Sequence, residues 1–151
     1  MTTNIVTGTT TSDHETARRA VIPTAVVSFA VAAFLSVTGA HNTTEWLVEI
    51  AIQAVAAGLL FGLVVRRGLR HESAGGRGIA MAVLALLIVF PAFWTGLPLQ
   101  LGAAAAILGF AGKRASQGSG KATASLVLGA LAVVAYLAIY VLDYLTTHGV
   151  G

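Results

Sequence analysis

The chain has no cysteine and very little charge. The absence of Cys from its 151 residues excludes disulfide bridges, thiolate nucleophiles and cysteine-ligated metals. Only 10% of the residues are charged, whereas a typical soluble domain has about 25%. With 56% hydrophobic residues and a mean hydropathy of +0.84, most of the chain is expected to be surrounded by lipid. The composition predicts an integral membrane protein with no separate soluble domain.

The nine basic residues are confined to three short stretches between apolar segments. These stretches contain Arg18 and Arg19; Arg66, Arg67, Arg70 and Arg77; and Lys113, Arg114 and Lys121. Loops on the cytoplasmic side of membrane proteins are enriched in Lys and Arg. Five membrane crossings place all three stretches on that side, with the N-terminus inside and the C-terminus outside. Because the basic residues adjoin apolar segments and form no folded basic surface, we expect no nucleic-acid partner.

The apolar segments predict an all-α, polytopic membrane protein with five transmembrane helices in one domain, residues 20–145. The predicted helices are residues 20–40, 46–65, 79–94, 97–112 and 123–142. About 20 residues suffice to cross a hydrocarbon core of about 30 Å. Residues 1–19 are interpreted as a disordered cytoplasmic tail, and residues 146–151 as a short outer tail. The alternative for the first segment is a cleaved signal peptide, since two arginines precede it.

The segment Ile79–Gly112 is interpreted as two crossings instead of one. Its 34 residues carry no charge, and a single helix of that length would span about 51 Å. Pro91, Gly96 and Pro98 interrupt it, because proline lacks an N–H and clashes with the preceding helical turn. Two short helices also keep the second and third basic stretches on the same side of the membrane.

Residues near the predicted outer boundary show a helix start but no metal motif. Asn42, with Glu45 three residues later, has the spacing of a capping box at the start of the second helix. The His and acidic residues expected on this side are His41, Glu45, Glu49, Asp143 and His148. They form no compact ligand motif, so we predict neither a metal nor another cofactor. The aromatic residues Trp46, Trp94, Tyr140 and Tyr144 are expected at the same boundary.

The second and fourth predicted helices begin an internal repeat. Without gaps, Gln53–Gly62 aligns with Gln100–Gly109, and Arg66-Arg67 then aligns with Lys113-Arg114. After a loop, Gly76–Ala85 aligns with Gly120–Gly129. The repeating unit is an in-going helix, a basic loop and an out-going helix. The sequence therefore predicts a leading helix followed by two hairpins in the same orientation.

The second hairpin carries a resemblance to a known family. Its motifs are Leu108-Gly109 before Lys113-Arg114, the loop Gln117–Lys121 and the segment Ala122–Gly129. With these motifs, residues 99–131 resemble the bacterial domain-of-unknown-function 4190 family of small membrane hairpins. That family often has Gly where this chain has Ser125. The resemblance implies a membrane hairpin and brings no catalytic residues.

Small residues predict the helix contacts. In lipid, small side chains let helix backbones approach closely, and such residues form most helix interfaces. The candidate packing residues are Gly58, Gly62, Gly102, Gly109, Ser125 and Gly129. We expect them to pack within the hairpins, and contact between copies of the chain is the alternative.

Three polar residues within the helices are the candidate membrane site. Glu49 and Gln53 share a helical face because they are four residues apart, and Gln100 is the repeat equivalent of Gln53. Polar residues in a membrane span face a partner, water or a transported ion. One interpretation is that Glu49 is solvated and the two glutamines hydrogen-bond across helices. The other is that all three line a polar path.

The sequence predicts a small multi-pass protein of the bacterial inner membrane without enzymatic activity, in a structural or accessory role. Its expected partners are the bilayer and either further copies of itself or other membrane subunits. The basic residues expected to contact anionic lipids are Arg66, Arg67, Arg70, Lys113 and Arg114. The alternative is an oligomeric channel or transporter with a polar path near Glu49, Gln53 and Gln100.

Labelling of single cysteines tests the predicted topology, because the chain has no native Cys. We expect Ser116→Cys to react with a membrane-impermeant thiol reagent only from the cytoplasmic side. Thr147→Cys is expected to react only from the opposite side. Reaction of Thr147→Cys from the cytoplasmic side alone would contradict five crossings.

Overall fold

The computed structural model describes residues 9–39, 42–69, 74–114 and 119–149. All regular structure in these residues is helical, and it contains no strand. The elements are α1 (Thr9–Gly39), α2 (Thr43–Leu59), the π-helix η1 (Leu60–Val65), α3 (Arg66–Gly68), α4 (Ala74–Ile88), the 3-10 helix η2 (Phe93–Thr95), α5 (Leu97–Arg114) and α6 (Ser119–His148). The all-α prediction is therefore confirmed for the described part of the chain.

Three of the described helical stretches are long and apolar enough to cross a membrane. They are Arg18–Val37, Thr43–Gly68 and Gly120–Thr147. Two shorter apolar helices, Ala74–Ile88 and Leu97–Lys113, lie between the second and third of them in the chain. The five predicted apolar segments thus all form helices, with the third and fourth shorter than the others.

The first helix begins earlier than expected. Helix α1 includes Thr9–Arg19, which corrects the expectation of a disordered tail for residues 9–19. An ion pair one helical turn apart, between Arg19 and Glu15 at 2.6 Å, supports this extension. Once the apolar segment has formed a helix, adding residues at its end avoids the cost of a new nucleus. Residues 1–8 lie outside the described residues.

Helix α2 starts at Thr43, directly after the predicted Asn42 cap and three residues before the expected bound at residue 46, and the helical chain ends later than expected. The Asn42 side chain accepts a hydrogen bond from the Glu45 backbone N–H at 2.8 Å, and its amide donates to the Glu45 carboxylate at 3.3 Å. At the other end, the helical chain continues through η1 and α3 to Gly68, past the expected end at residue 65. Arginine is a good helix former whose long side chain reaches solvent, so the Arg66-Arg67 pair does not stop the helix.

The third predicted helix is shifted toward the N-terminus. Helix α4 starts at Ala74, inside the expected loop, and ends at Ile88, six residues before the expected end at residue 94. Its early end has a local cause, because Pro91 cannot continue the helix. The chain turns at residues 89–92, forms η2, and reverses direction at Gly96, whose φ of 68° is left-handed. The predicted interruption at Pro91 and Gly96 is confirmed.

The last two helices extend beyond their predicted bounds. Helix α5 runs from Leu97 to Arg114, and Pro98 lies in its first turn, where no N–H is needed. Helix α6 runs from Ser119 to His148 and therefore includes residues 146–148 of the expected outer tail.

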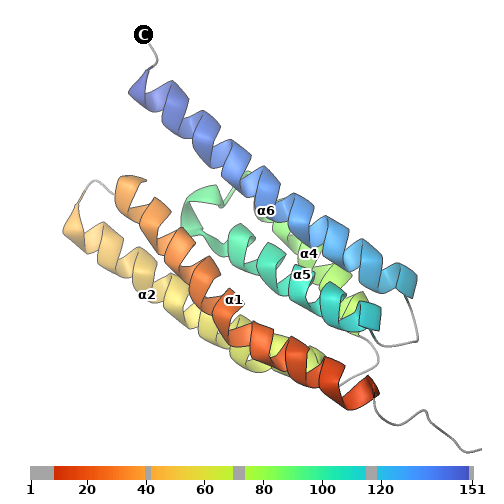
Figure 1. The fold of residues 1–151 in the computed structure, drawn as a ribbon. Helices are drawn as coiled ribbons and strands as arrows, with labels where there is room; N and C mark the ends of the chain where they lie inside the picture. Colours follow the sequence, from red (N-terminus) through yellow and green to blue (C-terminus); the bar gives the residue numbers. More distant parts are fainter. Residues whose placement is uncertain (1–8, 40–41, 70–73, 115–118, 150–151) are drawn as a thin grey trace, which may run out of the picture.

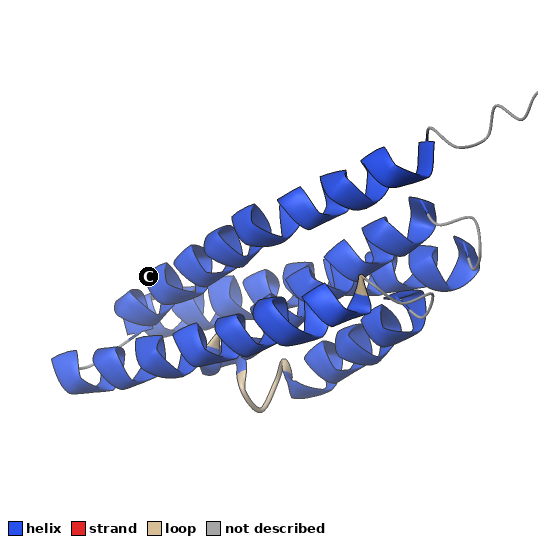
Figure 2. Cartoon of the chain, turned by 90° about the horizontal axis from the view of Figure 1, so that it is seen from below, coloured by secondary structure: helices blue, strands red, loops and turns tan. Residues whose placement is uncertain are grey.

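Helix α5 lies in the middle of the bundle. It packs against α4 and α6 on one side and against α1 on the other, while α2 packs mainly against α1 (Figure 1). The long helices run along a common direction, as the view from below also shows (Figure 2). Because successive helices alternate in direction, the segments that carry the described basic residues lie toward one end of the bundle (Figure 1).

Helices α5 and α6 are in close backbone contact through small residues. A Cβ atom added to Gly129 would lie 2.6 Å from the Ala106 nitrogen, and one added to Gly102 would lie 3.0 Å from the Gly129 carbonyl oxygen. Gly109 is similarly close to the α6 backbone at residues 122–126. The Ser125 hydroxyl donates a hydrogen bond across the contact to the Ala105 carbonyl at 2.8 Å. Four of the six candidate packing residues therefore meet at this contact.

The other two candidates, Gly58 and Gly62, make no such contact within the chain. No atom lies within 4 Å of a Cβ added to either glycine. The first predicted hairpin also differs from the expectation, because α4 packs against α5 and α6 instead of pairing closely with α2. The physical reason lies in Gly75 and Gly78, whose added Cβ atoms would collide with residues 122 and 125 of α6. These glycines let α4 approach α6.

Two glycine substitutions test this packing. We expect Gly129→Ala to destabilise the protein by about 1–3 kcal/mol, because its methyl group would overlap backbone atoms of α5. Gly58→Ala is the matched control in an open helix position, where it should be neutral or stabilise by up to about 1 kcal/mol. Unfolding by denaturant in detergent micelles, followed by circular dichroism, measures both. Equal effects of the two substitutions would contradict the described contact.

Candidate functional site

Two of the three candidate polar residues meet in the interior of the bundle. Gln53 and Gln100 are both completely buried, and Ser36 beside them is 7% exposed. The Gln53 side-chain amide donates to the Ser36 hydroxyl at 2.7 Å. The Gln100 amide donates to the Gln53 backbone carbonyl at 3.2 Å. This set of Ser36, Gln53 and Gln100, called the polar cluster below, links α1, α2 and α5.

A glycine makes room for the polar cluster. Gly96 precedes α5 in a left-handed conformation that L side chains rarely adopt. A Cβ atom there would lie 2.8 Å from the Ala32 methyl group and 3.0 Å from the Gln53 amide nitrogen. The turn between α4 and α5 can therefore approach α1 and α2 closely only because residue 96 has no side chain.

The polar cluster retains two unused acceptors. Neither the Gln53 Oε1 nor the Gln100 Oε1 atom accepts a hydrogen bond in the described structure, and both are buried. A carboxamide oxygen can accept two hydrogen bonds, and leaving a buried acceptor unpaired costs about 1–3 kcal/mol. These oxygens could therefore receive a proton donor or contribute to binding a small cation.

Glu49 lies at the edge of the polar cluster. It is one turn before Gln53 on α2 and is partly exposed. None of the hydrogen bonds described for the cluster involves the Glu49 carboxylate. The structure therefore brings Gln53 and Gln100 together and leaves Glu49 beside them.

Two members of this region were not predicted from the sequence. Ser36 lies on a buried face of α1 with Ser28 and Ala32, all four residues apart. That spacing of small residues in a membrane helix is the signal that could have identified it. Tyr140, expected as an interfacial aromatic residue, donates a hydrogen bond from its hydroxyl to the Leu35 carbonyl at 2.6 Å. It thereby joins α6 to α1.

The described residues contain no cluster of metal-ligating side chains. Among them, no three His, Cys, Asp or Glu side chains gather closely enough to hold a metal ion. His41 and Arg70 lie outside the described residues. Of the residues expected to contact lipid headgroups, Arg66, Arg67 and Lys113 are exposed near the basic end of the bundle.

A double-mutant cycle tests the link between α1 and α2 in the polar cluster. We expect Gln53→Leu and Ser36→Ala each to destabilise the protein, with a coupling energy of about 0.6 kcal/mol, the average for hydrogen bonds between membrane helices. The measurement is denaturant unfolding of the four variants in micelles. Strictly additive effects would mean that the two side chains do not interact.

Comparison with family models, with curated proteins and with solved structures gives no significant match to this chain. The resemblance of residues 99–131 to the membrane-hairpin family therefore stays a prediction from the sequence.

Proposed function

We propose that this chain is a multi-pass protein of the bacterial inner membrane that catalyses no reaction and acts as a structural or accessory subunit. The observation that carries this proposal is that buried polar side chains form hydrogen bonds from one helix to another. The amides of Gln53 and Gln100 connect helices to one another, as does the Ser125 hydroxyl. Polar groups used in this way stabilise the arrangement of helices.

The outward-facing side chains support a membrane location. Large apolar residues are exposed along the bundle, including Phe34 of α1 (69%), Leu87 of α4 (69%) and Phe90 in the turn after α4 (76%). Soluble monomers rarely expose contiguous apolar surface of more than a few hundred Å². In a bilayer these side chains would contact acyl chains or the helices of other subunits.

The clustering of charge supports the proposed orientation. The described basic residues lie toward one end of the bundle (Figure 1). Glu45, near the start of α2, and Asp143, near the end of α6, lie toward the other end. With the basic end in the cytoplasm, the arrangement obeys the positive-inside rule. At about 1.5 Å per residue, the 15-residue α4 is about 22 Å long, shorter than a hydrocarbon core of about 30 Å. The bilayer beside α4 would have to thin, or water would reach its ends.

The second candidate function is an oligomeric channel or transporter. The unpaired Oε1 atoms of Gln53 and Gln100, with Glu49 at the edge of the cluster, favour it. An ion crossing the membrane could replace part of its hydration shell with such oxygens. Neither glutamine lines the two pockets between α1 and the helix that runs through α2, η1 and α3, so these pockets supply no route to the oxygens.

Flux measurements separate the two functions. Under the first proposal, liposomes that contain the pure protein should release protons, Na⁺ and K⁺ no faster than protein-free liposomes. Extraction with alkaline carbonate checks that the protein is integral to the membrane. Flux that is lost in Glu49→Ala and in Gln100→Leu, but kept in the surface control Arg67→Gln, would replace the first proposal with the second.

A further inference from the structure

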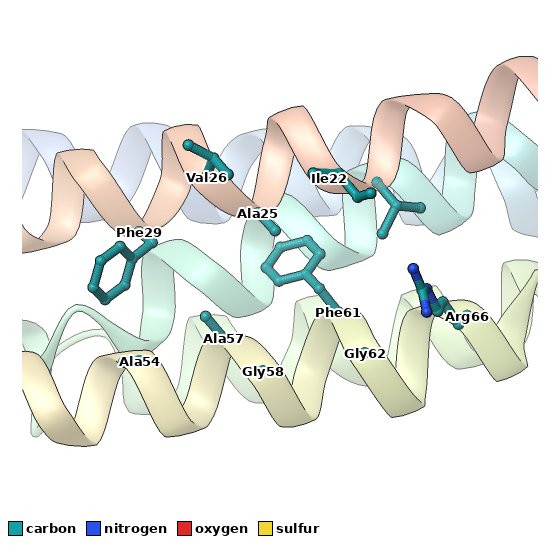
Figure 3. Close-up of a pocket in the computed structure, with 11 residues that line it drawn as sticks. Ile22, Ala25, Val26, Phe29, Ala54, Ala57, Gly58, Phe61, Gly62 and Arg66 are labelled. Atoms are coloured by element: carbon teal, nitrogen blue, oxygen red, sulfur yellow. The ribbon is translucent and has the colours of Figure 1, made fainter.

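An apolar groove runs between α1 and α2. Its volume is about 430 Å³, and Figure 3 shows its lining. The side chains and backbone that form its walls include Ile22, Ala25 and Phe29 of α1, and Ala57, Gly58 and Gly62 of the α2–η1 helix. The groove is open on the surface of the bundle that the proposed function places in lipid.

The missing side chains of Gly58 and Gly62 create this space. No atom lies within 4 Å of a Cβ added to either residue, so the groove floor is uncovered there. Gly62 also belongs to the π-helical segment η1, and Arg66 follows directly after that segment. The Arg66 side chain stands in the gap between the two helices at one end of the groove (Figure 3).

The groove continues into a basic pocket. Arg66, Val21 and Ile22 line both the apolar groove and a second pocket of about 490 Å³. The charged side chains around the second pocket are Glu15, Arg18, Arg19 and Arg66. Glu15 pairs with Arg19 at 2.6 Å. Among the described residues, Arg18 and Arg66 belong to no ion pair, so the pocket has an excess of positive charge.

The length of the groove matches one leaflet of a bilayer. Along the helix, Ala54 and Arg66 are twelve residues apart, which corresponds to about 18 Å. Half of a hydrocarbon core of about 30 Å is about 15 Å. An acyl chain that starts at Arg66 and follows the groove would therefore end near the middle of the bilayer.

We propose that this groove binds one anionic phospholipid, with an acyl chain between α1 and α2 and the phosphate at Arg66 and Arg18. The proposal rests on the proposed membrane location. Arginine is suited to the site, because its guanidinium forms paired hydrogen bonds with phosphate oxygens. The neutral, apolar walls of the groove suit the acyl chain of the lipid, and its cationic end suits the anionic headgroup.

A second copy of the chain fits this groove less well. A symmetric contact through Gly58 and Gly62 about an axis along the membrane normal would bring two Arg66 side chains together, and like charges repel. An α-helix with its side chains is also about 10 Å wide. A single acyl chain is much thinner.

The experiment uses the full chain in nanodiscs of phosphatidylcholine and phosphatidylglycerol. After extraction into mild detergent, native mass spectrometry measures which lipid stays bound. We expect the wild type to retain one phosphatidylglycerol, and Arg66→Gln to weaken that retention about five- to tenfold. Arg77→Gln is the control for an exposed arginine outside the site, since Arg77 lies in the first turn of α4 and lines neither the groove nor the basic pocket; its effect should stay below about twofold.

A groove-filling variant tests the acyl-chain part of the proposal. Gly62→Leu should remove both the anionic and the neutral lipid from the site, with Gly58→Leu as a second variant if the first loses its helical circular dichroism. Millimolar inorganic phosphate should not displace the retained lipid. Displacement by phosphate would indicate a phosphate site without a lipid chain and would overturn the proposal.

Two further outcomes would also overturn the inference. One is equal retention of phosphatidylglycerol by wild type, Arg66→Gln and Gly62→Leu. The other is a wild-type dimer that Gly62→Leu converts to a monomer without any change in bound lipid, which would make the groove an interface between copies. Carbonate extraction of the same samples separates these results from failure of the proposed function, because only the latter would release the wild type from the membrane.

Discussion

The close backbone contact between α5 and α6 is the constraint on which the rest of the structure depends. Lipid supplies no hydrophobic force between helices, so association needs surfaces that fit closely. Gly102, Gly109 and Gly129 provide that fit, and the Ser125 hydroxyl adds a hydrogen bond to the Ala105 carbonyl. Helix α4 joins the pair by the same means, through Gly75 and Gly78. The result is a three-helix unit with α5 at its inner face.

The α1–α2 pair is attached to this unit in a different way. Hydrogen bonds from the amides of Gln53 and Gln100 link α1, α2 and α5, and the Tyr140 hydroxyl joins α6 to α1. These contacts lie toward the end of the bundle opposite the basic residues. Toward the basic end, Gly58 and Gly62 leave α1 and α2 apart, and the space between them becomes the groove that ends at Arg66. Two modes of packing thus divide the chain into a tightly packed part and a part with an open groove.

Several features could be predicted because their causes are local or periodic. Apolar runs of about 20 residues predict helices, Pro91 and Gly96 predict the break between α4 and α5, and Asn42 predicts the cap of α2. Other features could not, because they depend on what a residue meets across space. Gly58 and Gly62 have the same spacing as residues that pack closely, yet no neighbour reaches them. Gly75 and Gly78 resemble loop residues in the sequence, but they let α4 pack against α6.

By itself, the sequence determined the helical class, the apolar segments and the confinement of basic residues to three stretches, since composition and periodicity are properties of the chain alone. It also singled out Gln53 and Gln100, because polar residues are costly in an apolar helix. Only the tertiary structure decided which helices pair, that Ser36 completes the polar cluster beside Gly96, and that Arg66 lies at one end of an apolar groove. These features arise from contacts between residues far apart in the chain, and the repeat pattern pointed to a different pairing of helices.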